Sequence, residues 1–196
     1  MEPHESQELI EKAHEVKEHS NKWTALGISV LAMFLAINHV GGGNSSKEAT
    51  RHNIEASNYY AFYQAKSIKQ TELRVATERL ELELKVHPDL SSSAVDEYQK
   101  LIASYNEKIK SYESDEKSSE GKKELLEKAK EHESERDHAL TQDPWFDYAE
   151  GILQISIVLL SISVLAGLPI MTIFGASLGG IGLLCMLNGF FLFMRL

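Results

Sequence analysis

The sequence has a single cysteine and no strongly basic block, and both shortages exclude classes of protein. Cys185 cannot close an intramolecular disulfide. It lies in an apolar stretch where a thiolate is disfavoured, so we interpret it as a small packing residue. Lys and Arg number 20 against 29 Asp and Glu, which gives a net charge of -9. Without a basic patch, nucleic acid is a poor partner for the chain, and anionic lipid headgroups find no basic cluster.

Catalytic motifs are also lacking. The sequence contains no nucleophile elbow, no phosphate loop and no zinc-ligand spacing. Glu11 with His14 and Glu135 with His138 have the Glu-x-x-His form that holds di-metal centres in four-helix bundles. Eight histidines and 29 acidic residues produce about one such spacing by chance. We therefore expect no enzyme activity, no catalytic residue, no cofactor and no metal site.

What the sequence does contain is three long apolar runs, Trp23 to Val40, Ile152 to Gly167 and Ile170 to Met194. A run of 18 residues rises about 27 Å as a helix, close to the hydrocarbon thickness of a bilayer. Backbone polar groups cannot remain unpaired in lipid, so such runs are helices. The sequence therefore predicts an integral membrane protein whose partner is the lipid bilayer.

The predicted fold is all-α, with three transmembrane helices and a long helical, coiled-coil-like stalk inserted between the first and the second. We expect Gly41 to Gly43 to end the first membrane helix, and Asp143-Pro144 to open the second. Trp23, Trp145, Phe146 and Tyr148 lie where an interfacial aromatic belt belongs. The predicted segments are a polar tail (1–21), a transmembrane helix (22–40), the stalk (41–144) and two further transmembrane helices (145–168 and 169–196).

The stalk shows a repeat of seven residues. Between Lys47 and Val86 there is no proline or glycine, and one apolar position recurs in each repeat, at Ile54, Ala61, Ile68, Val75 and Leu82. That spacing is typical of a coiled-coil seam or a long bundle helix. The positions four residues further on are mixed in character, which favours a broad bundle face over a two-stranded zipper. His87-Pro88 ends this helix, and two shorter helices return from about 91 and 122.

Three sets of residues are candidates for interaction surfaces. Small residues in the third membrane segment form a small-xxx-small pattern that favours close helix packing over ordinary glycine enrichment, and they are Gly175, Ala176, Gly179 and Gly180. Two intramembrane amides, Gln154 and Asn188, are expected to form hydrogen bonds across helices, with a pore lining as the alternative. The expected stalk interface is either the core where the returning helices pack or a contact between subunits, with lipid headgroups or another partner as the alternative. It comprises Tyr59, Tyr60, Phe62, Tyr63, Ile68, Tyr98, Ile102 and Tyr105.

Topology follows from the charges near the membrane segments. Both ends of the stalk adjoin apolar runs, so they lie on one membrane side. Lys47, Arg51, Lys130, Arg136 and Arg195 on the stalk side outnumber Lys12, Lys17 and Lys22 in the tail, and the positive-inside rule then favours a cytoplasmic stalk.

The chain resembles a bacterial membrane family known as domain of unknown function 4337. The resemblance rests on the charged tail, the entry at Lys22-Trp23, the run from Ala32 to Gly43, the Tyr60 to Lys69 segment and the hairpin opened by Asp147 to Glu150. It covers nearly the whole chain, and it implies the architecture but no activity.

We therefore expect a multi-pass protein of the bacterial inner membrane. It would act as a non-enzymatic scaffold or assembly protein that self-associates into a homo-oligomer. A pore-forming or mechanosensing channel component is the alternative, and a place in a larger membrane complex is a further one.

Overall fold

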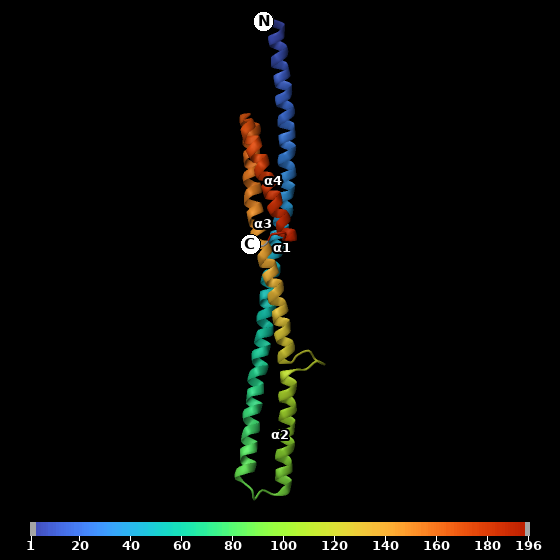
Figure 1. Ribbon diagram of the computed structural model, residues 1–196, viewed down its shortest axis with the longest axis vertical. Helices are drawn as coiled ribbons and strands as arrows, with labels where there is room; N and C mark the ends of the chain where they lie inside the picture. The colour runs from blue at the N-terminus through green and yellow to red at the C-terminus, as the bar shows by residue number, and fades with distance from the viewer. Residues whose placement is uncertain (1–2, 195–196) are drawn as a thin grey trace. The chain divides into compact units, whose positions relative to one another are not determined.

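The computed structural model describes residues 3–194, with side chains from residue 21 onward. Every regular element in that range is a helix, in the order α1 (Pro3–Val86), α2 (Ser92–Glu113), α3 (Lys122–Ala166) and α4 (Pro169–Phe191) (Figure 1). The expected all-α fold is thus confirmed for the described residues. Three helical stretches are long and apolar enough to cross a membrane, namely Asn21–Val86, Lys122–Ala166 and Pro169–Phe191. The predicted tail (1–21) belongs to α1 from Pro3 onward, and Glu11 and His14 lie outside the described side chains.

Internal contacts divide the chain into two units, and α1 and α3 contribute to both. Unit 1 combines Met1–Glu48 with His138–Leu196, and unit 2 is Ala49–Asp137. Unit 1 therefore holds the apolar stretches of α1 and α3 together with α4. Unit 2 holds α2 and the charged parts of α1 and α3.

Three predicted boundaries are confirmed. α1 ends at Val86, because Pro88 has no backbone N–H and restricts the residue before it. Ser91 caps α2, and its side chain accepts a hydrogen bond of 3.3 Å from the backbone N–H of Ala94. α3 ends at Ala166 and α4 begins at Pro169, a position where the missing N–H of proline costs nothing.

Two predicted breaks are wrong. α1 continues through Gly41 to Gly43, and α3 continues through Pro144. Close packing accounts for two of these glycines instead: a Cβ on Gly41 would lie 2.7 Å from the Phe146 ring, and one on Gly42 would lie 3.1 Å from the Cβ of Phe146. Pro144 removes one backbone donor and crowds the carbonyl of residue 140, yet α3 continues through it, since the φ that its ring fixes is helical.

Unit 1 has a small aliphatic core. Leu31 of α1 packs with Leu153 and Leu160 of α3. Half-buried side chains surround these three leucines, and they are Ile28, Leu35, Ile157 and Leu183. The core thus joins α1, α3 and α4.

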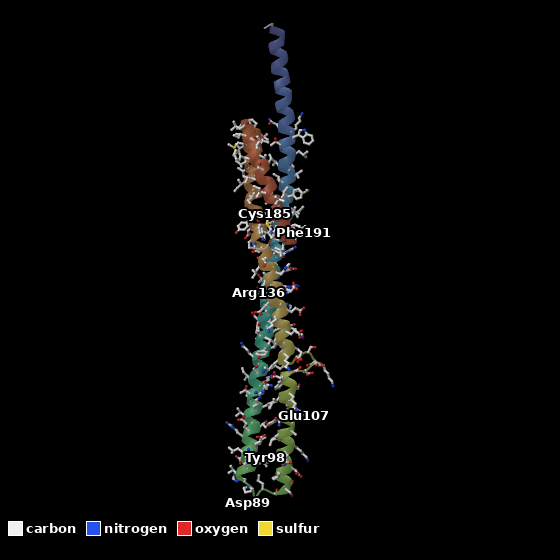
Figure 2. The ribbon with its side chains drawn as sticks, in the orientation of Figure 1. Asp89, Tyr98, Glu107, Arg136, Cys185 and Phe191 are labelled. Atoms are coloured by element: carbon white, nitrogen blue, oxygen red, sulfur yellow. The ribbon has the colours of Figure 1, made fainter. Side chains whose placement is uncertain are left out.

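In unit 2, α2 and the first part of α3 lie along α1 (Figure 1). A tight turn at Asp89 joins α1 to α2, and a loop from Ser114 to Gly121 joins α2 to α3 (Figure 2). The buried apolar side chains are few and mostly small, namely Ala49, Ala56, Leu125 and Ala129. Polar contacts therefore take a large part in holding these helices together.

Candidate functional site

The glycines of α4 form a packing face inside unit 1. A Cβ on Gly175 would lie 2.8 Å from the Leu160 side chain, and one on Gly179 would lie 2.9 Å from the Ser156 hydroxyl. Gly182 meets Leu153 at 2.8 Å in the same way. Since real Cβ atoms essentially never approach so closely, these positions allow α4 to pack against α3 nearer than any larger residue would.

The predicted small-residue pattern divides into two faces. Gly175 and Gly179 are buried, whereas Ala176 and Gly180 are exposed. A Cβ on Gly180 would meet nothing within 4 Å. The packing face within the chain is therefore the line through Gly175, Gly179 and Gly182, and the neighbouring line is open.

Hydroxyl groups cross-link the helices of unit 1. Ser156 is fully buried, and its hydroxyl donates a hydrogen bond of 2.6 Å to the carbonyl of Gly175. Ser163 donates to the carbonyl of Leu168 at 2.9 Å and also bonds the hydroxyl of Thr172. These bonds connect α3 to α4 and to the turn between them, in a place where few other polar partners exist.

The two predicted amides do not form hydrogen bonds across helices, which corrects the expectation. Gln154 is exposed and donates at 3.1 Å to Glu150, one turn earlier on α3. Asn188 is buried, and its amide exchanges two hydrogen bonds with the backbone of Met194, at 2.9 and 2.7 Å. The side chain of Asn188 thus ties the segment that follows α4 back to the last turn of the helix.

Within unit 1, Asn38 is an amide that does join two helices, and it is fully buried. Its Nδ2 donates a hydrogen bond of 2.9 Å to the carbonyl of Phe146. The sequence alone does not identify this contact, because a single Asn in an apolar run does not reveal which neighbour it faces.

Phe146 occupies a socket formed by glycines. Its side chain is 2 % exposed, so it is not part of an exposed aromatic belt. A Cβ on Gly41 or on Gly189 would lie 2.7 or 2.9 Å from its ring, and the ring of Phe190 packs edge-on at 4.9 Å. Three helices therefore meet at one aromatic side chain. The sequence does not reveal this contact, because Gly41 and Phe146 lie about one hundred residues apart.

In unit 2 the predicted tyrosines lie mostly on the inner face of α1. The Tyr59 ring stacks on His132 at 5.4 Å, and the Tyr60 hydroxyl donates at 2.9 Å to Glu133, which raises the pKa of Tyr60. Lys122 of α3 lies over the ring of Tyr63, 5.4 Å from its centroid. These contacts attach the start of α3 to α1. On α2, the predicted residues Tyr98, Ile102 and Tyr105 are half-buried.

Gln70 is the polar centre of this inner face and is only 4 % exposed. Its Nε2 donates at 3.1 Å to the carbonyl of Ile109 and at 2.9 Å to the carboxylate of Glu113. Its Oε1 accepts from Lys122 at 3.0 Å. The hydrogen bonds from Gln70 and then Lys122 hold the pKa of Glu113 below its usual range. One side chain thus joins α1 to the end of α2 and to the start of α3.

A pair of histidines on the same face was not foreseen. The Nδ1 atoms of His52 and His132 lie 2.8 Å apart. Among the side chains described from residue 21 onward, no group of three or more His, Cys, Asp or Glu is placed to hold a metal ion. Glu135 and His138, from the Glu-x-x-His spacing, are both exposed. The pair therefore adds a polar contact between α1 and α3.

Two of the predicted stalk-interface residues, Phe62 and Ile68, are exposed, and Phe62 borders a groove that Leu125 and Lys128 of α3 also line. The seven-residue seam that includes Ile68 is exposed along its length, and Val75 also borders a groove that Tyr105 of α2 lines. The large members of this seam that are exposed are Ile54, Ile68, Val75 and Leu82. The residues that contact α2 and α3 instead follow a second repeat, which contains Ala49, Ala56, Gln70 and Thr77.

Comparison with known proteins adds a family and no activity. The family profile described as Domain of unknown function (DUF4337) matches residues 20–192. No curated protein and no solved structure matches the chain. The family membership expected from the sequence is thereby confirmed.

Proposed function

We propose, for a chain that belongs to the DUF4337 family, that it is a multi-pass membrane protein acting as a non-enzymatic scaffold. In this proposal the three apolar helical stretches span a bilayer and unit 2 lies in water on one side of it. The protein self-associates, and its function is to hold copies or partners together at the membrane.

The polarity of unit 1 carries this proposal. Its interior buries polar side chains such as Asn38, Ser156 and Asn188, whereas its surface presents large apolar ones such as Leu165 at 87 % and Ile173 at 68 % exposure. A protein folded in water shows the opposite distribution. An apolar surface of this kind is stable where lipid replaces water.

The arrangement of unit 2 supports a scaffold role. Hydrogen bonds such as those of the buried Gln70 join its helices, and its aromatic side chains make packing contacts. The rival proposal, a pore-forming or mechanosensing component, requires Gln154 and Asn188 to share one water-lined surface. One is exposed and the other is buried in the last turn of α4, so the geometry favours the scaffold.

The membrane part of the proposal is tested by washing isolated membranes with alkaline carbonate, which should leave the full chain in the pellet. Release into the supernatant would refute membrane insertion. The mass of the protein in native nanodiscs should correspond to more than one copy, and a uniform monomer would refute self-association. Reconstituted bilayers should remain silent under voltage and tension, and reproducible conductance would favour the channel.

Orientation and location are part of the same proposal. We place unit 2 in the cytoplasm of a bacterial cell, with the spans in the inner membrane, because the basic residues near the spans are more numerous on that side. Protease added to right-side-out vesicles should leave unit 2 intact, and protease added to inside-out vesicles should remove it. The reverse result would place unit 2 outside.

A further inference from the structure

Within unit 2, α1 carries two stripes that each repeat every seven residues. The inner stripe packs against α2 and α3 and buries Ala49, Ala56, Gln70 and Thr77. The outer stripe, offset by five residues, consists of Ile54, Ala61, Ile68, Val75 and Leu82, and all five residues are exposed. Five residues correspond to about 140° of rotation on an α-helix, so the two stripes lie on nearly opposite faces.

A helix that packs only within its own chain buries its apolar stripe and exposes its polar one. On α1 the two stripes have the opposite character. The inner stripe contains an amide and a hydroxyl, whereas the outer one contains branched aliphatic side chains, with Ile68 exposed at 60 % and Val75 at 42 %. Rotation of α1 to bury the outer stripe is blocked, since it would break the hydrogen bonds from Gln70 to Ile109 and Glu113. The outer stripe is therefore left for a partner outside the chain.

We propose that the outer stripe is the surface along which a second copy of this chain pairs, helix α1 against helix α1. The inference rests on the proposed function, in which copies self-associate at the membrane, and it identifies the contact.

The length of the stripe selects a long helix as its occupant. From Ile54 to Leu82 the helix rises about 42 Å, and a strip about 10 Å wide gives roughly 400 Å² on each copy. Two copies would bury roughly 800 Å², below the usual range for stable interfaces in solution. Confinement of both copies to one membrane raises their effective concentration and compensates for the modest area.

The charges beside the stripe also fit a second copy. The positions three and four residues after each member of the stripe include Glu72, Glu78, Arg79 and Lys85. Two acids and two bases sum to zero in a chain whose net charge is -9, so the edges of the stripe do not repel their own copy.

Disulfide cross-linking of the full chain in membranes tests the pairing. In a Cys185→Ala background, Ile68→Cys should form a disulfide-linked dimer under mild oxidation, because Ile68 is the centre of the stripe and two copies in one membrane pair their α1 helices in parallel. Arg74→Cys is a matched exposed control, about 100° around the helix from Val75, and its dimer yield should be at least tenfold lower. Val75→Cys should also link to itself if the helices are parallel. A link to a coexpressed Ala61→Cys chain in place of itself would require antiparallel helices and would contradict pairing within one membrane.

A second measurement distinguishes loss of pairing from loss of folding. The Ile68→Asp and Val75→Asp double variant should keep the helical circular dichroism of the wild type and lower its oligomer fraction at least tenfold, whereas Arg74→Asp should not. Equal cross-linking at positions 68 and 74, or adducts only to another protein, would overturn the inference. If the wild type is oligomeric while these variants have no effect, only the assigned surface is wrong. If the wild type is monomeric, the self-association in the proposed function fails as well.

Discussion

Replacing Gly179 with alanine, and comparing it with the same change at Gly180, separates the two faces of α4. Both substitutions gain about 1 kcal/mol in helix propensity, so this contribution cancels. Only at position 179 does the new Cβ meet Ser156 at 2.9 Å and Leu31 at 3.0 Å. Overpacking of this kind costs about 1–3 kcal/mol, and a displaced Ser156 loses a hydrogen bond worth about 1 kcal/mol. We therefore expect Gly179→Ala to be about 2–4 kcal/mol less stable than Gly180→Ala.

Thermal unfolding in a mild detergent, followed by circular dichroism, measures this difference. For a chain of this length, about 1 kcal/mol corresponds to 2–4 °C in Tm, so the two variants should differ by at least about 4 °C. The cost of Gly179→Ala should shrink when Leu31 is already alanine, because the two positions are in contact. Equal melting temperatures for the two glycine variants would refute the close packing of α4, since neighbouring positions would then be equivalent.

Three further predictions concern single side chains. Gly41→Ala should lower Tm whereas Gly43→Ala should not, because a Cβ meets the Phe146 ring at 2.7 Å at the first position and nothing within 4 Å at the second; equal effects would refute the socket. Phe146→Ala should cost about 3–5 kcal/mol as a cavity replaces a buried ring, and denaturation in detergent measures it. The pKa of Glu113 is lowered in the folded chain, so its contribution is present above about pH 4.5 and is lost as the pH falls below that. The stability difference between wild type and Glu113→Gln should therefore shrink in acid, and a constant difference from pH 7 to about pH 3 would contradict the assigned contact.

The sequence predicts the helices well because apolar length and proline position are local signals. The end of α1 near Pro88 and the turn before Pro169 were both foreseen on those grounds. The continuation of α1 through Gly41 was not, since it depends on a ring that lies about one hundred residues further along the chain. The residues next to Gly41 in the sequence do not indicate such a distant partner.

The candidate surfaces were predicted only in part, because their contacts also depend on residues that are distant in the sequence. Seven-residue spacing at Ile68 and Val75 identified a stripe correctly, but it could not state which side of α1 the chain itself would cover. That choice is made by Gln70, whose three polar partners come from α2 and α3. When a buried amide fixes the rotation of a helix, hydrophobicity alone selects the wrong face as the one that the chain itself buries.

The Phe146 socket has a consequence for how sequences of this architecture can change. The ring requires the absence of a side chain at Gly41 and at Gly189, on two other helices. A single substitution at any of the three positions is costly, whereas a smaller residue at 146 would release the other two. We expect these positions to change together among relatives, so that their pairing in an alignment would record the contact that no single sequence reveals.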